Sequence, residues 1–227
     1  DLEQPRFEII NMARPGWNTD TQVNDLFLNG FKFQPDMIFL GYYHNDIPTP
    51  DYLKCDLGGV EKFFKISGVD QLLNFSRFFH FIKIRLINLE EKLGGNPSFI
   101  DCINDTYASL GWEMEKVYLD MILKACKIRN IKFIIGVLPL MYKLDKDYPS
   151  TIVHAKLGDY CQKSGTYCID FYEETFKDKM AENYTFSMQD RHMNAKGADL
   201  VAQTIFKKLE PLLEFDRLPL FHRAFTL

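Results

Sequence analysis

The segment 37–43, MIFLGYY, is an uninterrupted apolar run of the kind found in strands of parallel sheets, where both faces are buried. Upstream, the segment 7–13, FEIINMA, is also short and rich in β-forming residues, and the breaker cluster Arg14-Pro15-Gly16 ends it. Residues 18–31 between the two runs predict a helix, because their apolar side chains recur on one face. The order strand, helix, strand is typical of the start of an α/β fold.

The same alternation resumes in the second half of the chain. Strands are expected at 131–138 and 166–169, and helices at 111–128, at 151–163, near 171–179 and at about 195–209. Strands that alternate with helices indicate a layered α/β domain with a mainly parallel sheet. We therefore expect one domain over residues 1–210, followed by a C-terminal tail at 211–227 that docks on the body or on a partner.

Residues 47–107 interrupt this rhythm and are interpreted as a helical insertion or cap within the domain. Proline and glycine punctuate both ends, and one long helical pattern covers roughly 72–93. This helix is apolar around most of its circumference, which is typical of a deeply packed helix or of one that lines an apolar pocket. Phe78 and Phe79 are therefore candidate substrate-binding residues, and an extra helix packed on the flank of the sheet is the alternative.

Composition narrows the class of protein. The 227 residues carry 27 Lys+Arg and 31 Asp+Glu, a formal net charge of −4 without a long basic run, which argues against nucleic acid as a partner. No apolar run approaches the roughly 18 residues of a membrane-spanning helix. With 46% hydrophobic and 26% charged residues, the chain has the usage of a folded globular protein rather than a disordered one.

The five cysteines are an odd number without the spacing of a metal site. Cys126, Cys161 and Cys168 sit inside apolar patterns and are interpreted as small core residues. Cys55 and Cys102 flank the insertion and could pair if the protein is exported. Cytoplasmic and exported locations both stay open, as does the oligomeric state.

Polar residues follow the predicted strands at three places. Arg14-Pro15-Gly16-Trp17 comes after the first strand, His44-Asn45-Asp46 comes after the second, and Asp190-Arg191-His192 precedes the last helix. Ligands of open parallel sheets bind at the carboxyl ends of the strands. We therefore expect these three clusters to converge on one cleft, with Asn194 as the cap of the last helix.

The combination resembles the SGNH (GDSL-type) hydrolases, a family of esterases and acyl hydrolases, and in particular a bacterial subgroup. INMARPGWNTDTQ is similar to the family's glycine block, GYYHND to its asparagine block and QDRHMNAKGADLVA to its histidine block. The resemblance implies a three-layer α/β/α sandwich of the flavodoxin-like kind. It also implies an oxyanion hole from Gly16 and Asn45, a general base at His192 oriented by Asp190, and catalysis without metal or organic cofactor.

The family's nucleophile is a serine in a Gly-Asp-Ser block after a central first strand, and residues 1–227 contain no such block. Without that strand, two neighbouring strands would leave unpaired backbone groups, at about 1–3 kcal/mol each. We therefore expect the natural protein to continue N-terminally and to carry the nucleophile there. Residues 1–227 alone are then expected not to turn over esters.

These features predict a serine ester hydrolase that acts on a small-molecule, carbohydrate or lipid ester through an acyl-enzyme. Arg14, Trp17 and His44 are further candidates for substrate binding. An acyltransferase or acetyltransferase on a carbohydrate would use the same residues, since the acyl group can pass to an alcohol instead of water. A non-catalytic protein with the same fold that binds a ligand or partner is the third interpretation.

Overall fold

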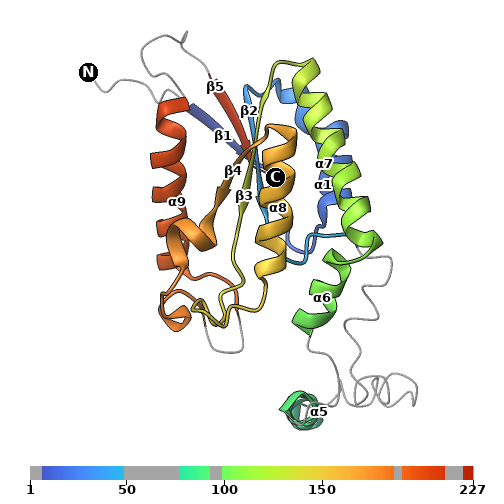
Figure 1. The fold of residues 1–227 in the computed structure, drawn as a ribbon, viewed down its shortest axis with the longest axis vertical. Helices are drawn as coiled ribbons and strands as arrows, with labels where there is room; N and C mark the ends of the chain where they lie inside the picture. Colours follow the sequence, from blue (N-terminus) through green and yellow to red (C-terminus); the bar gives the residue numbers. More distant parts are fainter. Residues whose placement is uncertain (1–6, 49–76, 93–98, 187–190, 213–221, 227) are drawn as a thin grey trace.

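The computed structural model describes residues 7–48, 77–92, 99–186, 191–212 and 222–226, and it is an α/β structure with a parallel sheet packed against helices (Figure 1). The sheet has the strand order β1-β5-β2-β3-β4, and every pairing in it is parallel. The strands are β1 (Phe7–Asn11), β2 (Met37–Tyr42), β3 (Lys132–Val137), β4 (Tyr167–Asp170) and β5 (His222–Thr226).

Helices connect the strands in the predicted alternation. The main helices are α1 (Thr19–Leu28), α5 (Arg77–Lys92), α6 (Phe99–Tyr107), α7 (Leu110–Ile128), α8 (Thr151–Ser164) and α9 (Ala195–Leu209). Short 3₁₀ or π turns add η1 (Gly30–Phe33), η2 (Tyr172–Phe176), η3 (Ala181–Asn183) and η4 (Glu210–Leu212). The predicted strands and helices outside the insertion are thus confirmed within a few residues at each end.

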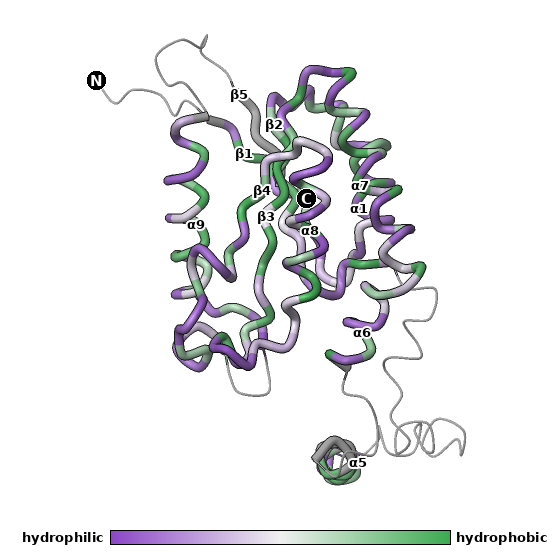
Figure 2. Tube along the Cα trace, viewed as in Figure 1, coloured by the Kyte–Doolittle hydropathy of each residue, from purple (hydrophilic) through white to green (hydrophobic). Residues whose placement is uncertain are grey.

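The core lies on both faces of the sheet, because the side chains of each strand alternate between the two faces. Ile38, Leu40 and Tyr42 of β2 belong to a cluster with buried side chains of α1, α6, α7 and α8. Met37 and Phe39 belong to a second cluster, which includes η2 and the end of α9. Figure 2 shows the matching hydropathy: β3 runs mostly through hydrophobic residues, while the helices alternate between hydrophobic and hydrophilic residues.

The expected gap in the sheet is not present, because β5 lies between β1 and β2. Five residue pairs join β5 to β1, and three join it to Met37, Ile38 and Phe39 of β2. A segment from the predicted C-terminal tail therefore pairs with β1 along its length and with the first half of β2, which supplies partners for these backbone groups. The prediction that a central strand is missing was wrong for this structure, and the sheet no longer argues for a further strand upstream.

Two helices of the insertion are described, and α6 was not predicted. Ile103 and Tyr107 of α6 are fully buried in the core cluster under α7 and α8. The described part of the predicted helix 72–93 is α5, and residues 72–76 and 93 lie outside the described residues. Phe78 and Phe79 of α5 are 64% and 48% exposed, and Figure 1 shows α5 away from the sheet. Neither packing on the flank of the sheet nor a role as a pocket wall is seen for these two side chains.

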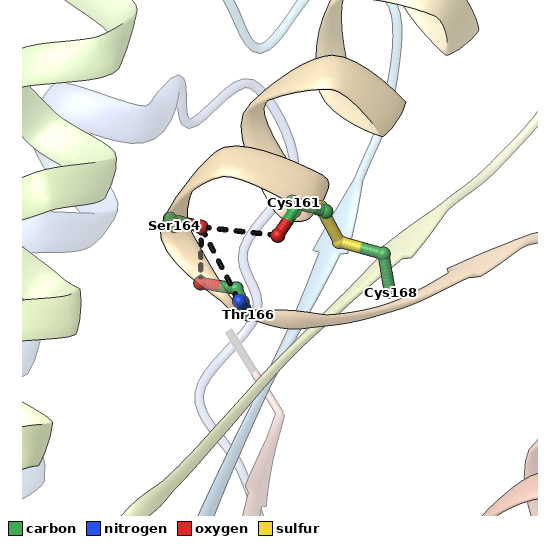
Figure 3. Close-up of a disulfide and its surroundings, with 4 residues drawn as sticks. All are labelled: Cys161, Ser164, Thr166 and Cys168. Atoms are coloured by element: carbon green, nitrogen blue, oxygen red, sulfur yellow. Dashed lines mark hydrogen bonds between the residues drawn. A yellow bond between two sulfur atoms is a disulfide. The ribbon is translucent and has the colours of Figure 1, made fainter.

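A disulfide joins Cys161 at the end of α8 to Cys168 in β4 (Figure 3). It spans the tight turn at Gly165, where the Ser164 hydroxyl donates to the Thr166 hydroxyl (2.8 Å). Cys161 is buried in the core and Cys168 packs against it, as predicted, but their pairing was not expected. The two cysteines are seven residues apart, and the turn brings their Cα atoms to 6.1 Å. Cys126 is free and buried, as predicted. Cys102 is also in a disulfide, whereas Cys55 lies outside the described residues.

The described helices include none that is both long and apolar enough to span a membrane.

Gly136 of β3 leaves no room for even one added methyl group. A Cβ at Gly136 would lie 2.3 Å from the Phe39 ring and 2.9 Å from the Phe171 ring, both of them in the packed core. We expect Gly136→Ala to lower the free energy of unfolding by about 1–3 kcal/mol, because a close-packed core resists added volume. Urea unfolding measures the change.

Gly158→Ala is the matched control, since a Cβ at this position in α8 meets nothing within 4 Å. Alanine is the better helix former, so this variant should gain about 0.5–1 kcal/mol. Equal effects of the two substitutions would contradict the packing described at β3.

Candidate functional site

A cavity of about 520 Å³ lies where the polar segments after β1 and β2 meet the segment before α9. Gly16, Asn45 and His192 all line it, although they come from three distant parts of the sequence. The full lining is Ala13, Arg14, Gly16, Trp17, Asn18, Gln22, Gly41, Tyr43, Asn45, Asp46 and His192. The expectation that the three polar clusters converge is thus met, because each cluster contributes at least one lining residue: Arg14, Gly16 and Trp17, then Asn45 and Asp46, then His192.

Gly16 lies in the turn between β1 and α1. Its φ of +78° is in the left-handed region, which a side chain disfavours, whereas a Cβ there would meet no atom within 4 Å. The requirement for glycine is therefore conformational rather than steric. The turn is closed by a long hydrogen bond from the Trp17 N–H to the Arg14 carbonyl (3.4 Å). This conformation presents the backbone of Gly16 at the cavity.

Asn45 lies in the turn that follows β2, and this turn is closed twice. The Asp46 N–H donates to the Tyr43 carbonyl (2.9 Å), and the Tyr43 N–H donates to Oδ2 of Asp46 (2.9 Å). The Asp46 carbonyl in turn accepts the N–H of Thr19, the first residue of α1 (2.9 Å). Because α1 directly follows the Gly16 turn, this bond limits how far Gly16 and Asn45 can move relative to each other.

His192 is placed by its neighbours before α9. The Arg191 guanidinium lies 4.2 Å from the centre of the Tyr142 ring, and the Asn194 side chain caps α9 by accepting the Gly197 N–H (3.0 Å). The predicted cap is therefore confirmed. The His192 ring is exposed and stacks on Tyr43 with centroids 6.2 Å apart. It can thus reach a ligand in the cavity.

His44, a predicted substrate-binding residue, is not among the lining residues. It is 5% exposed, and burial lowers its pKa to about 4, with Arg191 and His192 adding to the shift. The ring is therefore neutral at neutral pH. The apolar strand β2 continues directly into the turn, so residue 44 points into the protein while residue 45 faces the cavity.

A polar network beneath the turn was missed by the sequence reasoning. The Tyr42 and Tyr107 hydroxyls hydrogen-bond to each other (2.9 Å), and Tyr107 donates to the His44 carbonyl (2.9 Å). Glu115 of α7 is fully buried nearby, and burial raises its pKa well above the ordinary range, with Asp46 adding to the rise. Glu115 occupies an inward position of an amphipathic helix, and no local sequence signal distinguishes it from a surface glutamate.

Asp190, the predicted partner of His192, lies outside the described residues. Phe78 and Phe79 are described but do not line the cavity. Arg14 and Trp17 do line it, and the Arg14 guanidinium lies 4.9 Å from the centre of the Trp17 ring. The structure thus brings together five of the nine predicted site residues: Arg14, Gly16, Trp17, Asn45 and His192.

A second histidine has a visible carboxylate partner, yet it lies away from the cavity. His154 Nδ1 is 2.8 Å from Asp170 Oδ1, and its Nε2 is 3.0 Å from the Tyr148 hydroxyl. His154 is buried, and both of its ring nitrogens are engaged. The Tyr148 hydroxyl also accepts the Leu140 N–H (3.0 Å), so this network braces the connection from β3 to α8.

Within the ranges that the structure describes, no group of three or more His, Cys, Asp or Glu side chains could hold a metal ion. The chain matches no family model, no curated protein and no solved structure.

Asp46 predicts a distinctive dependence of stability on pH. Burial raises its pKa from 3.8 to about 7 in the folded protein, while the Tyr43 N–H opposes the rise. Between these values the folded protein keeps a proton that the unfolded chain releases, so stability falls as pH rises. The full loss is on the order of 4 kcal/mol, and Asp46→Asn should remove it because the amide oxygen can still accept the Tyr43 N–H.

Urea unfolding of both proteins between pH 4 and pH 8 measures this difference. His44 acts with the opposite sign, because its lowered pKa makes the folded state gain stability as pH rises from about 4 to 6.5. Both proteins contain His44, so its contribution is removed when the unfolding free energy of Asp46→Asn is subtracted from that of the unaltered protein at each pH. Asp105→Asn, at an exposed carboxylate of α6, is the control. A pH-independent difference for Asp46→Asn would contradict the burial of a protonated carboxyl.

Proposed function

We propose that this chain carries the oxyanion hole and general base of a serine ester hydrolase of the SGNH type. The single observation that carries the proposal is one cavity lined by Gly16, Asn45 and His192. These are the residues assigned to an oxyanion hole and a general base by the resemblance of their three segments to the family's sequence blocks. The three-layer arrangement of that family belongs to the same proposal.

Ester hydrolysis needs hydrogen-bond donors for the carbonyl oxygen and a general base close to them. Cleavage of an ester develops negative charge on the carbonyl oxygen, and fixed N–H donors stabilise that charge in the transition state. In this proposal the Gly16 backbone N–H and the Asn45 side-chain amide are those donors. The turns that hold them are linked by the Thr19–Asp46 hydrogen bond, so the donors need little reorganisation during the reaction.

His192 then acts as the general base that takes the proton of the nucleophile. The nucleophile attacks the ester carbonyl and the alcohol leaves with the proton from the imidazole. Water next attacks the acyl-enzyme, so the products are an acid and an alcohol. Asp190 is proposed to orient the imidazole, as the resemblance implies.

The described lining contains no serine, threonine or cysteine. We propose that the nucleophile is a serine outside residues 1–227, and the support for this is the resemblance alone, because β5 fills the expected gap in the sheet. A non-catalytic binding protein is the second candidate, and it is favoured by the same lack of a nucleophile among the described lining residues.

Asn45→Ala in the full-length natural protein tests the proposal. With p-nitrophenyl acetate we expect kcat to fall by about 10²–10³, because the amide acts on the transition state rather than on the bound ester. The KM should change little. Asn24→Ala, at an exposed position of α1 outside the cavity, is the control and should leave both constants unchanged.

Thermal unfolding of both variants establishes that they are folded. A folded wild-type protein without esterase activity would contradict the hydrolase and favour the binding protein. Full activity in Asn45→Ala would remove Asn45 from the oxyanion hole.

A further inference from the structure

Arg14 is the first residue of the Gly16 turn, and its side chain lies against Trp17 at the cavity. The guanidinium lies 4.9 Å from the centre of the Trp17 ring, and both residues line the cavity. Stacking on an aromatic face leaves the edge of a guanidinium free to donate hydrogen bonds. Among the described residues, no carboxylate forms an ion pair with Arg14.

The charge of the described lining is one-sided. Arg14 carries the one permanent charge among these residues, and Asp46 is the one carboxylate. Asp46 is 8% exposed and already accepts the Tyr43 N–H, so it is engaged within its own turn. Burial also raises its pKa to about 7, which favours the neutral acid and weakens its repulsion of an anion. Within the described lining, a negative group on a ligand therefore meets one permanent cation and one carboxyl that is only partly ionised at neutral pH.

The residue types of the lining also favour a polar ligand. Apart from Ala13, its described side chains are polar or aromatic, and none is leucine, isoleucine, valine, methionine or phenylalanine. A long acyl chain would therefore find no aliphatic side chain larger than alanine to pack against in this described lining. Gln22 lines the cavity as well, and its Oε1 is buried without a hydrogen-bond partner in the described part of the chain. The lining thus fits a small polar ligand.

We infer that the cavity takes esters that carry a carboxylate or a phosphate group on the same molecule, and that Arg14 is the residue that selects them. Guanidinium groups bind both anions through paired hydrogen bonds, so the two share one recognition chemistry. The anion anchors the molecule beside the Gly16 turn, where the ester carbonyl can reach the donors. This inference rests on the proposed hydrolase function for the fate of the ester, but not for the binding of the anion.

Binding to the full-length protein tests the inference without need of turnover. The probes are monomethyl succinate, methyl 3-phosphonopropionate and the neutral dimethyl succinate, and the readout is the NMR signal of the Trp17 indole N–H. Trp112, the other tryptophan of residues 1–227, is 5% exposed in the core and serves as the internal reference. We expect at least one charged ester to shift the Trp17 signal with an affinity about tenfold or more above that of the neutral diester.

Arg14→Gln should bring the charged and neutral esters to equal affinity. Arg129→Gln is the matched control, because Arg129 also stacks on an aromatic ring, that of Phe31 at 4.3 Å, but lies outside the cavity. Equal affinity of charged and neutral esters in the unaltered protein would overturn the inference. So would an unchanged preference in Arg14→Gln, or an equal loss in Arg129→Gln.

The carboxylate and phosphonate probes separate the two anions by their relative affinities. Failure of the inference and failure of the proposed function are also distinguishable. Hydrolysis of neutral and charged esters at equal efficiency would retain the hydrolase and overturn the selection by Arg14. Arg14-dependent binding without hydrolysis would retain the anion site and contradict the hydrolase.

Discussion

The hydrogen bond from the Thr19 N–H to the Asp46 carbonyl is the constraint on which the candidate site depends. It joins the first residue of α1 to the turn after β2, at a distance of 2.9 Å. Asp46 also closes its own turn through Tyr43, so one residue fixes both the shape of the turn and its relation to the helix. Around this point the Gly16 and Asn45 backbones can keep one geometry without any direct contact between them. The same residue is a buried carboxyl, and burial raises its pKa to about 7.

The parallel sheet explains why most of the fold is visible in the sequence. Strands buried on both faces must be apolar throughout, so β2 and β3 appear as continuous apolar runs between breakers. The strand β5 was not predicted, because the residues HRAFT mix polar and apolar types and their partners lie far away in the sequence. The disulfide between Cys161 and Cys168 was missed for a related reason: a turn decides whether two cysteines meet, and composition does not. Which segments pair with each other is thus what the local pattern leaves open.

The candidate site was also predictable only in part. The rule that ligands bind at the carboxyl ends of parallel strands predicted that the segments of Gly16, Asn45 and His192 would converge, and the cavity lies there. Which neighbour faces the cavity and which faces the core was not predictable, since His44 and Asn45 are both polar and differ only in the direction the turn gives them. The burial of Glu115 was not predictable either, because it depends on what α7 packs against. Backbone position was therefore predictable, and side-chain environment was not.

The most direct test of a serine hydrolase site is covalent labelling of the full-length natural protein with a fluorophosphonate, followed by peptide mass mapping. The account predicts one labelled serine, outside residues 1–227, and a labelling rate that falls about 10²-fold or more in His192→Ala, because the base that activates the nucleophile is lost. A protein that takes no label would contradict the account. So would a serine that is labelled at the same rate with and without His192.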